Sequence, residues 1–314
     1  MDPVAESLAD PCSYGFRKER STQDAMAGCF LSLCRRYSAE WILEGDIRGC
    51  FDELSHAWLL EQLPIHKGKL RAWLKAGFME QGVFHPTVDG TPQGGIISPT
   101  AANMALDGLD RLLQARFRGR HKVNLVRYCD DFIVTGASKM LLEQEVKPLV
   151  VQFLKERGLE LSEEKTHIVH IDEGFDFLGF NFRKYHGKLL IKPAKDSIAS
   201  IKGKIRAIIR AGKSLPQDVL IRRLNPIIRG WAGYYRHVVS KKSFDDIDHA
   251  IWRMMWNWAK RRHPQKASEM DQKPLLFAPG RSQLGVYGWI GHALSDGVLS
   301  DPTSCKNPGP GQPL

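Results

Sequence analysis

Residues 126–134 read VRYCDDFIV and place two adjacent aspartates, Asp130 and Asp131, between two segments rich in strand-forming residues. Val123 to Arg127 and Phe132 to Val134 both favour strands, so the aspartates fall where a tight hairpin turns. An exposed turn alone can explain such a pair, because an Asp side chain caps the backbone of its own turn. The alternative is that the two carboxylates, which repel each other, share a chemical task with residues elsewhere in the chain.

The charge of the chain is divided unevenly along its length. The 314 residues carry a formal net charge of +10. Residues 183–266 hold 21 Lys or Arg against 5 Asp or Glu, a net of +16, so the remainder carries −6. A basic half of this kind favours a polyanionic partner. The length is sufficient for one large domain with an appendage, or for two domains.

The cysteines and the N-terminus indicate the compartment. The six cysteines include no C-x-x-C pair and no histidines at zinc-site spacing, which is typical of free thiols in a reducing compartment. The N-terminal MDPVAESLADPCSYG lacks the basic start and apolar run of a signal peptide, and no 18 consecutive residues are apolar. These patterns predict a soluble protein without a membrane partner, in the cytoplasm of a bacterium or in an organelle matrix.

Strand, helix and turn patterns follow one another in the first hundred residues. Residues 41–47, WILEGDI, have the short, apolar-rich character of a strand, with Asp46 at its end. Ser55 can cap a helix that runs to Leu63, and residues 68–77 offer a second helix. The segment 83–99, VFHPTVDGTPQGGIISP, has too many turn residues for a helix and predicts a short ribbon and loop.

Two longer helices flank the aspartate hairpin in the sequence. Apolar residues recur at helical spacing through 98–117, with Ser98 as the cap and Pro99 at the first helical position. After the hairpin, residues 138–157 predict another amphipathic helix, which Pro148 breaks or bends. Each of these helices has an apolar face that a neighbouring sheet can cover.

The order of these elements predicts the fold. Segments 167–171 and 175–182, HIVHI and FDFLGFNF, have the composition of strands. The order strand, helix, hairpin, helix, strand predicts an α+β fold, a split βαβ arrangement in an antiparallel sheet with helices on one face. In such a sheet Asp46 comes close to the Asp130–Asp131 turn.

The C-terminal part changes to helices. Isoleucines at helical spacing mark one helix between residues 198 and 209, and 244–263 marks another. Between them lies the segment 224–240, LNPIIRGWAGYYRHVVS, and Lys and Arg fill the faces opposite the apolar stripes. From Ala267 the composition shifts to Pro, Gly and Ser, which predicts a poorly ordered tail.

Three carboxylates on neighbouring strands suggest a chemistry. Nucleotidyl transfer needs a nucleophilic 3′-hydroxyl and a triphosphate whose developing charge is neutralised, and two Mg²⁺ ions about 3.5–4 Å apart do both. Mg²⁺ prefers hard oxygen ligands, so a carboxylate cluster on rigid strands is the expected site. Asp46, Asp130 and Asp131 supply that cluster, and bound metal would relieve their mutual repulsion.

Six segments in a fixed order resemble a known family. They are YGFRKERSTQDA (14–25), EGDIRGCFD (44–52), GTPQGGIISP (90–99), YCDDF (128–132), GLELSEEKT (158–166) and FDFLGF (175–180). Their order and wording resemble the fingers and palm motifs of reverse transcriptases encoded by group II introns, and 224–240 is similar to the thumb, or maturase, domain of that family. The resemblance covers Tyr14 to Lys266, and six ordered motifs make coincidence negligible.

The resemblance implies four parts in the chain. These are a residual fingers segment at 1–40, a reverse-transcriptase palm at 41–182, an α-helical thumb/maturase domain at 183–266 and a divergent tail at 267–314. Family members carry earlier fingers motifs, with a lysine and an arginine that hold the triphosphate, and they continue with more aromatic and basic residues after the thumb. The chain therefore resembles a member truncated at both ends.

The implied activity is that of an RNA-directed DNA polymerase with a role in intron RNA binding and splicing. Its partners would be intron RNA, an RNA template with a DNA primer, dNTPs and two Mg²⁺ ions, with a homodimer as a further option. The alternative is a catalytically impaired remnant that acts at most as an RNA-binding protein. The sequence leaves open which intron RNA is bound and whether another chain supplies the missing fingers.

The resemblance also assigns roles to residues near the aspartates. It implies that Asp46 and Asp130 bind both metals, with Asp131 beside them and the backbone carbonyl of Ile47 as a further ligand. Phe51 occupies the place of the gate that excludes a ribose 2′-hydroxyl, although an aromatic residue at this position could equally belong to the core.

Further residues are assigned to the nucleotide, the pyrophosphate and RNA. Gln93 and Gly94 match positions beside the incoming nucleotide, against the alternative of a plain Gly-Gly turn. Lys165 matches a lysine that could stabilise or protonate the leaving pyrophosphate, or it could be a solvated surface residue. The residues predicted to contact RNA are Arg17, Arg20, Arg222, Arg223, Arg229, Trp231, Tyr235 and Arg236. For the arginines the alternative is a solvated face, and for the aromatic residues it is the core of the helical domain.

Overall fold

The computed structural model describes residues 2–80, 83–85, 89–91, 95, 97–117 and 119–262. The predicted tail at 267–314, and with it Lys266, lies outside these residues. The chain divides into two compact units, Met1–Leu190 and Ile191–Leu314. The boundary predicted between residues 182 and 183 falls inside a strand, Phe180–Tyr185, so the first unit continues beyond it.

The first unit is built around a central antiparallel sheet. Its strands are β1 (Trp41–Arg48), β4 (Leu125–Tyr128), β5 (Asp131–Gly136), β6 (Glu160–Leu161) and β7 (His167–His170). The order is β4-β5-β1-β6, and β7 also pairs with β1. Because β1 and β4 are each antiparallel to β5, they run parallel to each other on either side of it. Helices connect β1 to β4, so the predicted split βαβ arrangement is confirmed.

The helix predicted at 98–117 is two helices in the structure. These are α5 (Ser98–Leu106) and α6 (Leu109–Arg116), and the prediction of one continuous helix is wrong. Asp107 is extended between them, and Gly108 has a φ of 97°, in the left-handed region that glycine adopts readily. The break turns the carboxylate of Asp107 and the amide of Gly108 toward the N-terminal segment, where Asp10 accepts a hydrogen bond from that amide.

The helix predicted at 138–157 also differs in detail. It consists of α7 (Lys139–Leu141), a π-helical segment (Leu142–Val146) and α8 (Lys147–Lys155). The irregularity therefore comes before Pro148, which lies in the first turn of α8, where its missing N–H is tolerated. The expected break at the proline itself is wrong.

Shorter elements complete the first unit. The helix predicted from Ser55 is confirmed, because Ser55 accepts a hydrogen bond at the start of the next helix. The elements are α1 (Asp2–Leu8), α3 (His56–Gln62), α4 (Lys67–Leu74), the ribbon of β2 (Phe78–Glu80) and β3 (Val83–His85), and a 3₁₀ turn (Gly119–His121). A second sheet of three strands has the order β10-β9-β8, from β8 (Phe175–Phe177), β9 (Phe180–Tyr185) and β10 (Lys188–Pro193).

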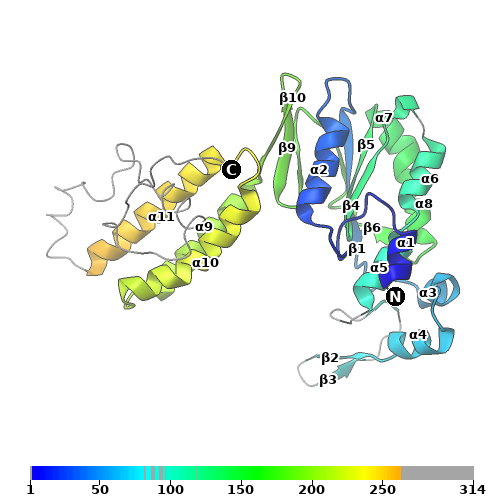
Figure 1. Ribbon diagram of the computed structural model, residues 1–314, viewed down its shortest axis with the longest axis horizontal. Coiled ribbons are helices and arrows are strands. Elements are labelled where there is room, and N and C mark those ends of the chain that lie inside the picture. Colours follow the sequence, from blue (N-terminus) through cyan, green and yellow to red (C-terminus); the bar gives the residue numbers. More distant parts are fainter. Residues whose placement is uncertain are drawn as a thin grey trace, which may run out of the picture. The chain divides into compact units, whose positions relative to one another are not determined.

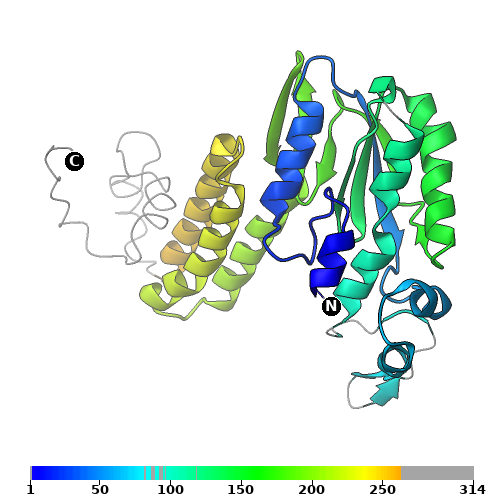
Figure 2. The same cartoon turned by 45° about the vertical axis from the view of Figure 1, so that its right-hand side comes forward.

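The largest core of the first unit lies on one face of the central sheet. Leu43 and Ile47 of β1 belong to one buried cluster with residues of α5, α6 and α8. The other face carries α2 (Thr22–Leu33), whose Gly28 lies against Val126 of β4. Figures 1 and 2 show α2 across the sheet from α6 and α8. The predicted α+β fold is confirmed, but the helices are not confined to one face, because α2, which the sequence analysis did not place, covers the other.

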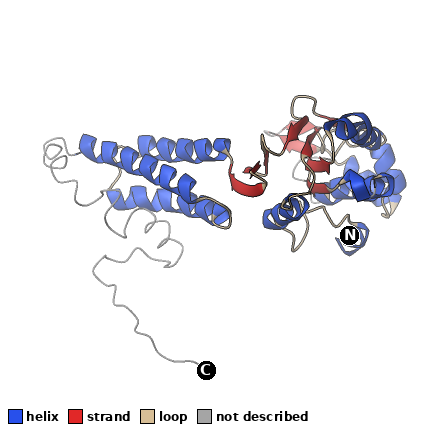
Figure 3. Ribbon diagram, turned by 90° about the horizontal axis from the view of Figure 1, so that it is seen from above, coloured by secondary structure: helices blue, strands red, loops and turns tan. Residues whose placement is uncertain are grey.

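Three long helices form the described part of the second unit. They are α9 (Lys195–Ala211), α10 (Gln217–Tyr235) and α11 (Lys241–Arg262), and α9 packs against both of the others (Figure 3). The predicted isoleucine stripe is buried at Ile201, Ile205 and Ile209. None of the helices in the described part of either unit combines the length and apolar character needed to cross a membrane.

Candidate active site

The aspartate hairpin has the predicted form. Tyr128 of β4 pairs with Asp131 of β5, so Cys129 and Asp130 alone form the turn. Cys129 has a φ of 60°, in the left-handed region that non-glycine residues seldom occupy. On its other side β5 pairs with β1, which aligns Asp46 with Asp131. The structure thus brings Asp46, Asp130 and Asp131 to one end of the sheet.

The three carboxylates influence one another. The pKa of Asp131 is raised to about 6, first by partial loss of hydration, then by the charges of Asp130 and Asp46 and by a hydrogen bond with Asp46. Asp131 lies at the exposed rim of the site. A bound cation would relieve the repulsion from the other two carboxylates, and so would remove that contribution to the raised pKa.

Lys165 is the cation that faces these carboxylates. Its Nζ donates a hydrogen bond to Oδ2 of Asp46 at 3.1 Å, while its side chain is 68% exposed. This hydrogen bond and the charge of Asp46 raise the pKa of Lys165. The ammonium is therefore protonated and exposed.

An open pocket of about 720 Å³ adjoins the carboxylates. Asp46, Ile47, Phe51, Asp130 and Lys165 line it together with β6 and the turn residues 162–164 that follow it. The ring of Phe51 is half-buried and meets the ring of Phe16 edge-on, with 6.0 Å between the centroids. Phe51 is therefore a wall of the pocket, in contact with the N-terminal segment. Gln93 and Gly94, predicted to lie beside the nucleotide, fall outside the described residues.

The three carboxylates supply hard oxygen atoms, the type of donor that divalent cations take. Among the described residues, no group of three or more His, Cys, Asp or Glu side chains is arranged to hold a metal ion. The oxygen donors of Asp46, Asp130 and Asp131 nevertheless fit a hard divalent cation. Their crowding, which shows in the raised pKa of Asp131, is what such a cation would neutralise.

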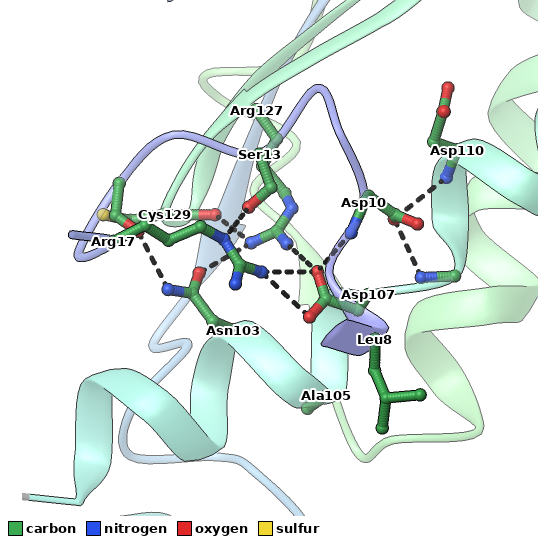
Figure 4. Close-up of polar contacts among 12 residues, drawn as sticks. Leu8, Asp10, Ser13, Arg17, Asn103, Ala105, Asp107, Asp110, Arg127 and Cys129 are labelled. Carbon is green, nitrogen blue, oxygen red and sulfur yellow. Dashed lines mark hydrogen bonds and ion pairs between the residues drawn. The ribbon is translucent and has the colours of Figure 1, made fainter. Parts of the chain in front are cut away.

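A buried ionic network lies beneath the hairpin, and the sequence analysis missed it. The side chain of Arg127 is 0% exposed, and its Nη2 donates to Asp107 at 2.9 Å. Its Nη1 donates to Asn103 at 3.1 Å and to the carbonyl of Cys129 at 3.3 Å (Figure 4). An arginine inside the apolar strand LVRY was the signal available in the sequence, because charged residues are seldom fully buried without a partner.

Arg17 belongs to the same network, which corrects the prediction that it contacts RNA. Its side chain is 1% exposed, and its Nη2 donates to both oxygens of Asp107, at 2.7 and 2.9 Å. Its remaining donors reach Glu6 and Ser13. A guanidinium that is 1% exposed and bonded on all three nitrogens does not present a surface to a phosphate.

Arg20 also bonds within the chain, although less completely. Its Nη1 donates to the backbone oxygens of Asp10 and Ser13, and its Nη2 reaches Glu6 at 3.4 Å. The side chain remains partly exposed. Contact between Arg20 and RNA stays a prediction.

The aromatic residues of α10 differ in how far they are buried. Tyr235 is 4% exposed and donates its hydroxyl to Ser197 at 2.8 Å, so the prediction that it stacks on RNA bases is wrong. Trp231 is half-buried against Tyr235 and Phe244, with ring centroids 4.5 and 5.6 Å away. Tyr235 therefore belongs to the core of the helical unit, which is the alternative that the sequence left open, whereas contact between the half-buried Trp231 and RNA stays a prediction.

The arginines of α10, and Arg236 directly after it, are for the most part exposed. Arg222, Arg223 and Arg236 are exposed, and Arg222 forms an ion pair with Asp218 one turn earlier on the helix. Arg229 is half-buried, and its Nε has no hydrogen-bond partner among the described residues. Contact between these four arginines and RNA stays a prediction.

The split βαβ sheet, with carboxylates on a hairpin and on the adjoining strand, defines the palm of a template-directed polymerase fold. A family model described as reverse transcriptase (RNA-dependent DNA polymerase) matches residues 1–182, and one described as group II intron, maturase-specific domain matches residues 198–274. The chain therefore belongs to the reverse transcriptase family, in its group II intron reverse transcriptase/maturase branch.

Known proteins share parts of this sequence. Protein YkfC of Escherichia coli (strain K12) is 32% identical over 219 residues, 57% of this chain and 57% of the relative. Group II intron-encoded protein LtrA of Lactococcus lactis subsp. cremoris is 27% identical over 403 aligned positions, 98% of this chain and 66% of the relative. The chain thus spans less than two thirds of the length of either relative. A solved structure of telomerase from Candida albicans with a fragment of telomeric RNA aligns with a TM-score of 0.42 and 14% identity, over 87% of this chain and 51% of that one.

Proposed function

We propose that this chain is an RNA-directed DNA polymerase of the group II intron type that also binds intron RNA. The observation that supports polymerisation is the register of the sheet, which sets Asp46 opposite Asp131 and next to Asp130 at the mouth of an open pocket. The pocket is large enough for a nucleotide, and the cationic Lys165 and the aromatic Phe51 lie on its lining.

The residues have distinct roles in this proposal. Asp46 and Asp130 would hold two Mg²⁺ ions, with Asp131 and the carbonyl of Ile47 beside them. When bound, the ions lower the pKa of the primer hydroxyl and neutralise charge on the phosphates. Lys165 holds its proton at Nζ beside Asp46 and can deliver positive charge, or that proton, to the leaving pyrophosphate.

Phe51 would select the sugar. Its half-buried ring forms a wall of the pocket and is supported by Phe16. A rigid ring beneath C2′ of a bound nucleotide leaves no room for a hydroxyl, so the pocket would favour dNTPs over rNTPs. Phe51→Ala should therefore allow rNTPs to compete in primer extension, with little change in dNTP use. Unchanged discrimination in an active variant would mean that Phe51 only supports the fold.

Primer extension on an RNA template with Mg²⁺ tests the polymerase directly. Asp130→Asn should abolish extension, because losing a metal carboxylate removes several kcal/mol of transition-state stabilisation. The variant should keep the far-UV circular dichroism and melting temperature of the parent, since Asp130 lies in a half-exposed turn and its charge repels Asp131. Extension by Asp130→Asn at the parent's rate would exclude the assignment.

RNA binding without polymerisation is the second candidate, and it rests on a basic groove between α9 and α11. The groove holds about 370 Å³, and the charged residues among its described lining are all cations: Arg206, Arg210, Lys213, Arg261 and Arg262. Together with the net +16 of residues 183–266, it suits a phosphate backbone. A chain that binds structured RNA but extends no primer would favour this candidate.

A further inference from the structure

A single buried carboxylate joins the N-terminal segment to the strand that leads into the catalytic turn. Asp107, at the break between α5 and α6, accepts hydrogen bonds from Arg17 on one side and from Arg127 on the other (Figure 4). All three side chains are buried. Burying charges is costly even when they are paired, and an apolar cluster of the same volume often stabilises a fold as well or better. Stability alone therefore explains this network poorly.

Arg127 is the member of this network that touches the turn. Its Nη1 bridges the side-chain oxygen of Asn103 and the carbonyl of Cys129, while its Nη2 is held by Asp107. Cys129 is the left-handed residue immediately before Asp130. A non-glycine residue in this conformation is strained and persists only where its surroundings hold it. The guanidinium of Arg127 is one such restraint.

The N-terminal segment supplies a second restraint on the same residue. Arg127 donates its amide to the carbonyl of Cys12, and its own carbonyl accepts from Tyr14, both at 2.9 Å. This brings Gly15 so close to the turn that a Cβ there would lie 2.1 Å from Sγ and 2.6 Å from N of Cys129. Asn103 fixes Gly15 by donating to its carbonyl at 2.8 Å. The turn is thus held between Arg127 and Gly15.

We propose that Arg127 is a positioning residue, which sets the Asp130 carboxylate by holding the carbonyl of Cys129, with residues 12–15 as the clamp that holds its backbone and the turn in place. The inference rests on the proposed function for the role of Asp130. The holding of the turn itself can be measured independently of any activity.

Two matched variants distinguish the positioning of the turn by Arg127 from simple neutralisation of the Asp107 charge. Arg127→Lys keeps a cation beside Asp107, but an ammonium is a compact point charge and cannot reproduce the planar fork that reaches both Asp107 and Cys129. Arg17→Lys makes the same chemical change on the other side of the same carboxylate, where no contact with the turn exists among the hydrogen bonds of Arg17. Both variants leave one arginine on Asp107.

Hydrogen–deuterium exchange of the intact chain provides the readout. Exchange in the peptide that covers residues 126–133 should be faster by about tenfold in Arg127→Lys than in Arg17→Lys, on the order expected for one lost hydrogen bond to a charged group. The two melting temperatures should be similar. Equal exchange of this peptide in the two variants would overturn the proposal.

A third variant covers the case in which Arg127→Lys does not fold. Gly15→Ala changes no buried charge but drives a methyl group into Cys129, so it should also speed exchange at 126–133. Parent-like exchange in Gly15→Ala would mean that the clamp does not hold the turn, which would also overturn the proposal.

Binding of Mn²⁺, followed by electron paramagnetic resonance, connects the turn to the metal carboxylates. Arg127→Lys should weaken binding by about tenfold or more, as is typical when a residue that orients a ligand is changed, and Arg17→Lys should not. Equal Mn²⁺ affinities of the two variants would contradict positioning of Asp130. A parent chain that neither binds Mn²⁺ nor extends a primer would contradict the proposed function, whereas the exchange comparison would still decide whether Arg127 holds the turn.

Discussion

In the unit Met1–Leu190, Arg17, Arg127 and Arg157 are buried and donate hydrogen bonds to oxygens of the chain, whereas in the helical unit Arg222, Arg223 and Arg236 are exposed. A buried guanidinium has lost its water and must find several acceptors in fixed positions, so it orders the segments around it. An exposed guanidinium keeps its water and can exchange it for a phosphate. The same residue type therefore builds the fold in one unit and forms a charged surface in the other.

The acidic partners differ in the same way. Asp107 is buried between two arginines, while Asp218 forms an exposed pair with Arg222 on α10. Asp248 of α11 is a third case, because it is buried and its Oδ1 has no hydrogen-bond partner among the described residues. Each of the three aspartates gives a prediction of different size.

The largest effect on stability is expected at Asp107. Asp107→Asn removes the charge that two buried arginines share, so it should lower the free energy of unfolding by about 3–5 kcal/mol. Asp218→Asn is the matched control, and the loss of an exposed pair near a helix start should cost no more than about 1 kcal/mol. Chemical denaturation of both variants measures the difference. Similar losses of unfolding free energy in the two variants would contradict the contrast between buried and exposed ion pairs.

An intermediate effect, which depends on pH, is expected at Asp248. Burial, and then the charge of Asp245, raises the pKa of Asp248 from 3.8 to about 7. Between these values Asp248 is protonated in the folded state and charged in the unfolded state, so folding takes up a proton. Its contribution to stability is therefore fully present below pH 3.8 and is lost as the pH rises toward about 7.

Asp248→Asn removes this dependence and should make the chain more stable than the parent at pH 8, by about 1–3 kcal/mol, the scale of an unsatisfied buried group. At pH 5 the advantage should shrink, because the parent's carboxyl is then protonated. Melting temperatures of both proteins across this range provide the measurement. A parallel pH profile for parent and variant would show that Asp248 does not titrate with folding.

The sequence was most informative where a local pattern determines the structure. Two runs of strand-forming residues around two aspartates predicted the hairpin, and the order of elements predicted the split βαβ sheet that brings Asp46 to it. Both features follow from the period of strands and from short connections. The break at Gly108 was missed, because an apolar helical pattern continues through it and the partners that stabilise the interruption, Asp10 among them, are distant in the sequence.

Whether an individual charged or aromatic residue is buried or exposed depends on contacts with residues far away in the sequence. Arg17 occurs in a loop-like segment rich in charge, yet its partner Asp107 lies 90 residues away. Tyr235 is one of several aromatic residues beside arginines, and only the packing of α9 and α11 on α10 shows which ring is buried. Local composition cannot distinguish a solvated arginine from a buried one when the acceptor is supplied by another element.

The smallest effect per residue is expected for three exposed arginines, two on α10 and one directly after it. It tests whether exposed arginines of the helical unit bind RNA. Each phosphate contact releases counterions and contributes roughly 0.7–0.9 to the slope of log affinity against log salt. Replacing Arg222, Arg223 and Arg236 together by Gln should therefore flatten the slope for a structured RNA by about 2–3. Arg17→Lys serves as the control, since a buried cation that keeps its charge and its partner releases no counterion, and its slope should match that of the parent. The full chain, titrated with one RNA hairpin at several salt concentrations, gives both slopes. If the triple variant kept the parent's slope, these arginines would be a solvated face, and the groove between α9 and α11 would become the part of the helical unit to test for RNA contact.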